Sequence, residues 1–178
     1  INGTLNISNG TFYSLDVSDI NGVLDISTGT FNAYENFDAT GGQINFSNNG
    51  RLELAGTVTS LGNLSTTQGT VVYGGGLQSV LADTYYNLEI KNNGTKTAAG
   101  NVTVNNILTV DNPNAIGSVS YAIGNTTTTV SDSVIINGGN IIISNGTFNS
   151  LNVSDINGVL DISTGTFNAN GNFDATGG

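Results

Sequence analysis

The sequence lacks four residue types, and each absence argues against a class of function. Its 178 residues contain no cysteine, histidine, methionine or tryptophan. Without cysteine there is no disulfide framework and no thiolate metal site. The nucleophile–base pairs of serine and cysteine hydrolases and the usual nitrogen and sulfur ligands of zinc are missing too. We therefore expect neither a hydrolase of these classes nor a zinc protein.

Positive charge is also scarce. Three basic residues, Arg51, Lys91 and Lys96, stand against thirteen acidic ones, which gives a net charge of −10. Nucleic-acid binding needs lysine or arginine to replace the counterions condensed on phosphates, and attachment to an anionic membrane needs a basic patch. We therefore expect neither partner. No apolar run approaches the ~20 residues that span a bilayer, so we expect no membrane insertion of this segment.

What the sequence has instead is a mixture of small polar residues and evenly spread apolar ones. It holds 25 glycines and a single proline, Pro113, and its hydrophobic fraction is 37%. That fraction is low for a globular domain, but it is too high and too regular for a disordered chain. The composition predicts an ordered fold that is not compact in the usual way.

The sequence from residue 137 onward repeats the sequence from residue 1. Residues 137–178 match residues 1–42 at 33 of 42 positions, and the stretch Ser18–Ala33 recurs unchanged as Ser154–Ala169. Such closeness indicates duplication of a long unit. We interpret 1–136 as one full unit and 137–178 as the start of the next, in a longer array. The pattern is under way at both ends, so we expect a longer polypeptide whose targeting signals lie elsewhere.

A shorter period lies inside the unit. The motif Ile7–Phe12 returns as Ile26–Phe31, and again as Phe46–Leu52. About seven such periods fill the unit. Within them apolar residues alternate with polar ones, which predicts short strands, and no segment shows a helical period. Examples of the alternating pairs are Leu5 and Ile7, Leu15 and Val17, Leu24 and Ile26, Phe37 and Ala39, Leu52 and Leu54, and Leu88 and Ile90.

Short strands in a repeat of this length predict an all-β parallel β-helix, or β-solenoid, with about 19–21 residues per coil and apolar side chains inward. Right-handed winding is the commoner form and is our expectation. Coils stack about 4.8 Å apart, so seven coils add roughly 34 Å of rod per unit. The alternative is an array of antiparallel β-sandwiches, from which neither the short repeat nor the scarcity of proline follows naturally.

Asparagine–glycine pairs recur between the predicted strands. Both residue types tolerate positive φ angles, so we expect these pairs at the corners of the coils. They begin at Asn2, Asn9, Asn21, Asn49, Asn93, Asn137 and Asn145.

Several short motifs lie between Gly69 and Val110. They are Thr70–Tyr73, Gln78 with Val80, Tyr85–Leu88, Gly94–Thr97, Val102–Val104 and Leu108–Val110. In this combination the segment, about a quarter of the chain, resembles one found in giant repetitive surface proteins and adhesins of the Bacteroidetes type, many exported by the type IX secretion route. The resemblance implies an extracellular location and a repetitive β stalk. It supplies no catalytic, cofactor-binding or metal-binding residue.

The acidic residues are the candidates for catalysis or calcium binding. Sugar-cleaving solenoid enzymes need clustered carboxylates. Here the aspartates fall in different predicted coils, and several recur in the second copy, so solvated or turn-capping roles are favoured. Asp16 and Asp19 are the candidates for weak calcium binding at a corner, although no EF-hand or nonapeptide calcium loop is present. The aspartates considered are Asp16, Asp19, Asp25 and Asp38, with Asp155, Asp161 and Asp174 in the second copy.

Threonines and tyrosines are the candidates for a lateral binding face. Rows of threonine would suit ice, but the candidate threonines do not recur at a constant coil offset. Tyrosine rings could stack on carbohydrate or pack into the core, and core packing is favoured. Asp132–Val134 resembles the short O-glycosylation motif of the same bacterial group, with an ordinary turn favoured. The threonines are Thr57, Thr59, Thr95, Thr97 and 126–129, and the tyrosines are Tyr73, Tyr85, Tyr86 and Tyr121.

These observations predict a structural role. We expect a stalk or filament segment of a secreted cell-surface adhesin or extracellular fibre, with no catalysis and no cofactor. Its partners would be the neighbouring repeat units, with lateral association into fibres as a further option. The alternative is a lateral face that binds polysaccharide or ice.

Overall fold

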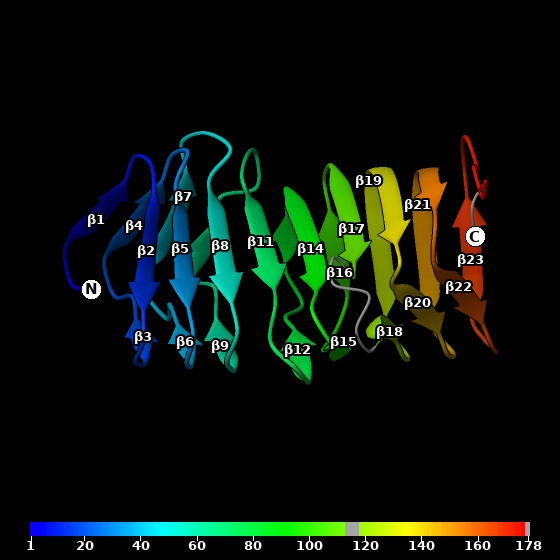
Figure 1. Ribbon diagram of the computed structural model, residues 1–178, viewed down its shortest axis with the longest axis horizontal. Coiled ribbons are helices and arrows are strands. Elements are labelled where there is room, and N and C mark those ends of the chain that lie inside the picture. The colour runs from blue at the N-terminus through cyan, green and yellow to red at the C-terminus, as the bar shows by residue number, and fades with distance from the viewer. Residues whose placement is uncertain (113–117, 177–178) are drawn as a thin grey trace.

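The computed structural model describes residues 1–112 and 118–176, and Pro113 lies outside the described residues. Within them it is all-β, with parallel strands stacked in a solenoid of about eight turns of roughly 20 residues each (Figure 1). The prediction of a parallel β-helix is confirmed. No helix long and apolar enough to cross a membrane occurs in the part of the chain that is described.

Each coil contributes one strand to each of three faces. Face 1 holds β1 (Thr4–Ile7), β4 (Val23–Ile26), β7 (Gln43–Phe46), β10 (Asn63–Leu64), β13 (Thr84–Tyr85), β16 (Val102–Val104), the first halves of β19 (Thr127–Asn137) and β21 (Thr147–Ile156), and β23 (Thr166–Ala169). Face 2 holds β2 (Thr11–Ser14), β5 (Thr30–Ala33), β8 (Arg51–Leu54), β11 (Thr70–Tyr73), β14 (Asn87–Lys91), β17 (Ile107–Asp111), and the second halves of β19 and β21. Face 3 holds β3 (Ser18–Asp19), β6 (Phe37–Asp38), β9 (Val58–Ser60), β12 (Gln78–Val80), β15 (Gly94–Ala98), β18 (Val119–Ile123), β20 (Asn140–Ile143) and β22 (Val159–Ile162).

Faces 1 and 3 continue through the middle of the rod although their strand ladders are interrupted there. The Asn105 side chain, just after β16, donates from Nδ2 to the carbonyl oxygen of Thr66, just after β10, at 3.0 Å. On face 3, β9 contacts β12, and Figure 1 shows β3, β6, β9, β12, β15 and β18 in one row along its lower edge. The three faces therefore run the length of the rod.

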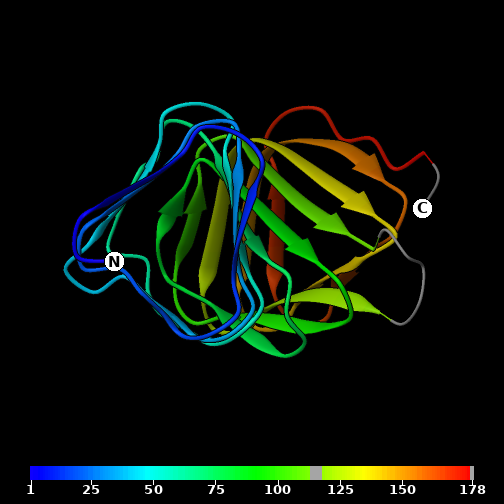
Figure 2. The same ribbon diagram turned by 60° about the vertical axis from the view of Figure 1, so that its left-hand side comes forward.

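The rod winds with a right-handed sense. In Figure 1 the chain advances from left to right, and the strands at the front, such as β2, β5 and β8, point downward. A chain that descends on the near side while moving rightward follows a right-handed helix. Figure 2, turned toward the N-terminal end, shows the coils stacked around a shared interior.

Coil length varies around the predicted value. On face 2, Thr11 pairs with Thr30 and Thr30 pairs with Arg51, which are spacings within the predicted range. The shortest coil brings Asn87 opposite Thr70, and the longest brings Ser133 opposite Ile107. The additional residues of the longest coil lie between β17 and β18.

The core is a continuous stack of inward-facing apolar side chains. Leu24 lies between Leu5 and Ile44 on neighbouring coils, and Leu24 and Ile44 are fully buried. Each such burial contributes roughly 1.5–3 kcal/mol, and a single coil could not provide it. Leu15 and Val17 differ from the prediction, because they are 76% and 60% exposed. Leu15 occupies the corner after β2, where the alternation slips by one residue, and Val17 lies in the first coil, which has a coil on one side only.

The asparagine–glycine pairs lie between strands or at strand ends, and the residue that takes a positive φ angle differs among them. Glycine takes the positive φ at Gly10, Gly94 and Gly138, whereas asparagine itself takes it at Asn145, with φ of 65°. The expectation that these pairs supply positive φ angles holds at these four corners.

The two sequence copies lie on different faces. Thr11–Ser14 belongs to face 2, but its copy Thr147–Ser150 pairs with Thr127–Val130 on face 1. Likewise Val23–Ile26 is on face 1 and its copy Val159–Ile162 on face 3. The equivalent strands β1 and β20 are 19 strands apart in the numbering, and each strand moves the chain on by one face, or a third of a turn. Because β19 spans two faces and counts twice, the chain makes 20 such steps between them. One unit, residues 1–136, thus spans six and two-thirds turns.

Candidate binding surface on face 2

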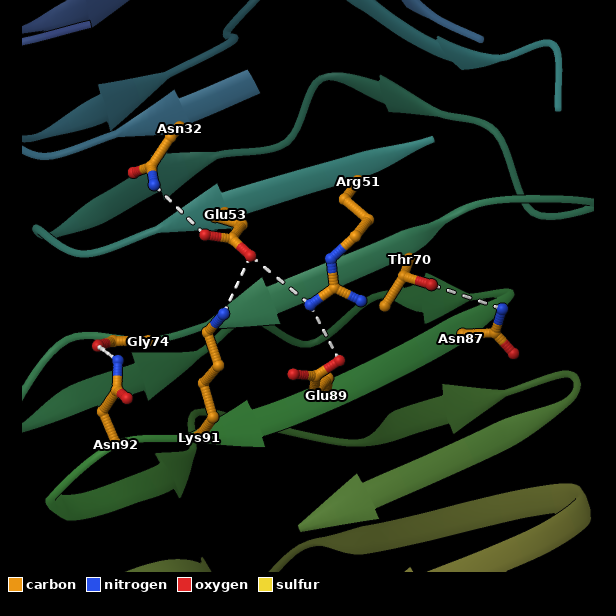
Figure 3. Close-up of polar contacts among 9 residues, drawn as sticks. All are labelled: Asn32, Arg51, Glu53, Thr70, Gly74, Asn87, Glu89, Lys91 and Asn92. Carbon is orange, nitrogen blue, oxygen red and sulfur yellow. Dashed lines mark hydrogen bonds and ion pairs between the residues drawn. The ribbon is translucent and has the colours of Figure 1, made fainter. Parts of the chain in front are cut away.

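A cluster of charged side chains covers the outer surface of face 2 (Figure 3). Arg51 Nη2 lies 2.9 Å from Glu89 Oε2, and Lys91 Nζ lies 2.8 Å from Glu53 Oε1. Glu53 also accepts a hydrogen bond from Asn32 Nδ2 at 3.1 Å. Strands β5, β8 and β14 supply these residues because alternate positions of each strand point outward.

The ion pairs bury an apolar residue that faces outward. Val72 pairs with Glu53 on one neighbouring coil and with Glu89 on the other. Both ion pairs join β8 to β14, so they pass over β11 and leave Val72 fully buried. The charged cluster thus closes the surface over a short apolar side chain, and it leaves neither cation free for an anionic partner.

The third cation is inside the rod. Lys96 on β15 is fully buried, and its Nζ donates to the carbonyl oxygens of Lys91, Asn92 and Asn93 at 2.7, 2.8 and 3.2 Å. These carbonyls belong to a tight corner in which Asn92 has φ of 60°. Burial lowers the pKa of Lys96 to about 8. All three basic side chains therefore have partners within the chain.

Beside the charged cluster, face 2 is hollowed. One outward position repeats on successive coils as Tyr34, Ala55, Gly74 and Lys91, because their strands pair in register. The two small residues in the middle leave a depression of about 290 Å³ between the tyrosine and the lysine. Its lining also includes Asn32, Glu53, Leu54 and Asn92.

Two exposed tyrosines stand at the N-terminal end of this hollow. Tyr34 lines it and is 50% exposed, and Tyr13, on the preceding coil, is 58% exposed. Their ring centroids are 6.1 Å apart, with 33° between the ring planes. Sequence reasoning missed both residues, because Tyr13 lies just beyond the recurring motif Ile7–Phe12 and Tyr34 lies beyond its second occurrence, Ile26–Phe31. The signal was available, since both tyrosines become asparagine in the second copy.

The tyrosines considered from the sequence are placed differently. Tyr73, Tyr85 and Tyr121 are fully buried, and Tyr86 is partly buried. The hydroxyl oxygens of Tyr73 and Tyr85 lie 3.1 Å apart, and Tyr85 also donates to the carbonyl oxygen of Leu81 at 2.9 Å. Burial raises the pKa of Tyr73 to about 12 and raises those of Tyr85 and Tyr121 as well. Core packing is therefore confirmed for these three.

The aspartates form short-range contacts in their own turns. Asp38 accepts hydrogen bonds from the hydroxyl and backbone N–H of Thr40, and these bonds lower its pKa. Its copy Asp174 makes the same contacts with Thr176. Across the described residues, no group of three or more acidic side chains is arranged to hold a metal ion.

The side chains of three further aspartates accept hydrogen bonds from different partners. Asp16 accepts from the N–H of Val17, Asp19 from Asn21 Nδ2, and Asp25 from Ser47. Asp161 lies in β22, and the side chain of Asp155 falls outside the described part.

The candidate threonines do not form an uninterrupted row. Thr57, Thr95 and Thr97 border a hollow on face 3 together with Leu77. Ser79 and Thr97 pair across coils, but the next residues in that row are Ala122 and Ile142. Thr128 is buried, with its hydroxyl 2.9 Å from that of Tyr121. In the O-glycosylation motif, Ser133 is buried and its hydroxyl contacts that of Ser154.

The arrangement on face 2 can therefore offer two aromatic rings, amide groups and carboxylates to a ligand, and no free cation. In comparisons with known proteins, no family model, no curated protein and no solved structure matches the chain.

Proposed function

We propose that this chain is a stalk segment of a secreted cell-surface adhesin or extracellular fibre and catalyses no reaction. The observation that supports it best is continuity across the boundary between sequence copies. That boundary, at residues 136 and 137, falls inside β19, which pairs with β17 on one side and β21 on the other. Adjacent units joined in this way would form one stiff rod rather than a string of separate domains.

The mechanical argument rests on the backbone. Parallel pairing links each coil to the next by main-chain hydrogen bonds along the rod, and pulling along its length loads many of these bonds together. The net charge of −10 discourages non-specific lateral sticking. A rod of this kind would hold a binding domain away from the cell.

The resemblance of Gly69–Val110 to surface proteins of the Bacteroidetes type supports the extracellular assignment, and type IX secretion is the export route that it suggests. We propose neighbouring repeat units as the principal partners, with lateral association into fibres as a further possibility. Six and two-thirds coils per unit at about 4.8 Å each correspond to roughly 32 Å of rod per unit.

The proposal is tested by cryo-electron imaging of native cells labelled with an antibody against residues 1–136. Label distributed along thin surface fibres is the expected result. Label on compact particles or on soluble secreted material would contradict a stalk.

A further inference from the structure

The two sequence copies differ in a restricted way. Beyond the first six residues of the repeat, only four positions change, namely Tyr13 to Asn149, Asp16 to Asn152, Tyr34 to Asn170 and Glu35 to Gly171. All four residues of the first copy are exposed, and they lie near the corner that follows face 2. The buried residues of the same stretch are identical in both copies. Duplication has thus kept the core and changed one surface patch.

The second copy shows that this patch is not needed for folding. Its strands pair in the register of the first copy, with Thr147 opposite Thr166 as Thr11 is opposite Thr30. Where Tyr13 is replaced, Asn149 Oδ1 simply accepts a hydrogen bond from Asn168 Nδ2 at 2.8 Å. The fold therefore does not require the tyrosine pair.

We propose that Tyr13, Tyr34 and the adjoining hollow bind a neutral glycan chain. Exposed tyrosine rings offer flat apolar faces on which the C–H faces of sugar rings can stack. Asn32, Glu53 and Asn92 border the same hollow and can exchange hydrogen bonds with sugar hydroxyls. This lateral site goes beyond the proposed stalk function and does not depend on it.

The geometry favours a chain that runs along the rod. The hollow extends from Tyr34 on the second coil to Lys91 and Asn92 on the fifth. The coil spacing of about 4.8 Å is close to the length of one residue in an extended polysaccharide. Successive sugars can therefore meet equivalent positions of successive coils.

The charges favour a neutral ligand over an acidic one. Lys91 and Arg51, the nearby cations, are held in ion pairs with Glu53 and Glu89. Exposed Asp16 and Glu35 add negative charge at the tyrosine end, and the whole chain carries −10. A polymer bearing carboxylates or sulfates would be repelled.

Affinity electrophoresis tests this site. The chain is run through native gels containing hydroxyethyl cellulose, α-mannan or galactomannan, with alginate as the acidic polymer. We expect at least one neutral polymer to retard the chain and alginate not to do so. The double variant Tyr13→Asn/Tyr34→Asn reproduces the residues of the second copy, so it should fold, and its apparent affinity should fall by about tenfold or more.

Two further variants make the test specific. Tyr86→Asn is the matched control, the same change outside the patch, and it should bind like the parent. Ala55→Leu should weaken binding by filling the hollow while keeping both tyrosines. The site is refuted if no neutral polymer retards the chain, if the double variant binds as well as the parent, or if Tyr86→Asn loses as much binding. None of these results bears on whether the chain forms a stalk.

Discussion

At the scale of single residues, Lys96 is the least expected feature of the rod. A lysine at an inward position contradicts the apolar alternation of its neighbours, yet it is fully buried. Three carbonyl oxygens of the preceding corner accept its hydrogen bonds. Removing the ammonium group would leave these carbonyls without that donor, which is costly for buried groups.

We predict that Lys96→Met lowers the free energy of unfolding at pH 7 by about 2–4 kcal/mol, the range for breaking charged hydrogen bonds in a buried site. Lys91→Met makes the same chemical change in a surface ion pair and should cost about 1 kcal/mol or less. Urea unfolding followed by circular dichroism measures both. Equal effects of the two substitutions would show that the corner does not depend on Lys96.

The buried tyrosines predict a dependence of stability on alkaline pH. An unfolded tyrosine loses its proton near pH 10, whereas the folded pKa of Tyr73 is about 12, and those of Tyr85 and Tyr121 are raised too. A raised folded pKa contributes stability that is fully present below pH 10 and is lost as the pH rises through the folded pKa. The urea midpoint should therefore fall between about pH 10 and 12.

Lys96 changes stability with pH in the opposite direction. Its folded pKa of about 8 lies below the unfolded value, so the unfolded chain binds more protons between pH 8 and about 10. Stability should rise with pH across that window in the parent chain and not in Lys96→Met. A flat profile for the parent from pH 8 to 12 would contradict both assignments.

At the scale of strands and corners, close approach between coils sets the requirement for particular glycines. A Cβ added to Gly42 would overlap the carbonyl oxygen of Ile20 on the preceding coil. Gly22 and its copy Gly158 show the same situation, because an added Cβ would overlap a backbone oxygen at each. These two lie before strands on different faces, so the requirement belongs to the corner itself rather than to one side of the rod.

We predict that Gly42→Ala destabilises the chain by about 2 kcal/mol or more, because the added methyl group meets backbone rather than a movable side chain. Gly76→Ala is the matched control, since a Cβ there meets nothing within 4 Å. Thermal unfolding of the two variants should separate them clearly. The same unfolding midpoint for both variants would mean that the coils can move apart at the corner without loss of stability.

Much of the strand pattern could be predicted from the sequence. The alternation at Leu24 and Ile26, or at Leu52 and Leu54, correctly identifies inward residues, because period two is a local property of a strand. The corners were harder, since one residue more or less changes which side chain points outward, as at Leu15. The candidate site escaped prediction for a different reason. Tyr13 and Tyr34 are one predicted coil apart in sequence, but both lie outside the recurring motif from which the coils were recognised.

At the scale of the whole molecule, the notable property is the mismatch between repeat and coil. The two sequence copies adopt the same strands and corners but are displaced by one face. This is possible because each face offers a similar parallel ladder with an apolar inner side, so a given strand sequence fits any of the three. In a tandem array, equivalent residues of successive units would point in three directions and return to the first after three units.

The sequence alone did not reveal this displacement. The length of the repeat divided by that of an average coil suggests about seven turns, and the difference between seven turns and six and two-thirds depends on individual corners. The shortest coil, ending at Asn87, and the longest, ending at Ser133, fall between the copies and decide the count. Only the strand pairing resolves it.

Paired cysteines test this displacement most directly, and the chain contains no other cysteine. Thr129 and Asn149 are Cα partners on face 1, within the range that a disulfide can bridge. If the two copies instead lay on the same faces, Asn149 would be on face 2, as Tyr13 is. It would then continue the row that contains Tyr13, Glu89 and Thr109 and lie next to Ile135. We predict that Thr129→Cys/Asn149→Cys forms a disulfide under mild oxidation and that Ile135→Cys/Asn149→Cys keeps two free thiols, as measured by alkylation and mass spectrometry. The reverse result would contradict the one-third-turn offset and the pairing of β19 with β21 on which the continuous rod rests.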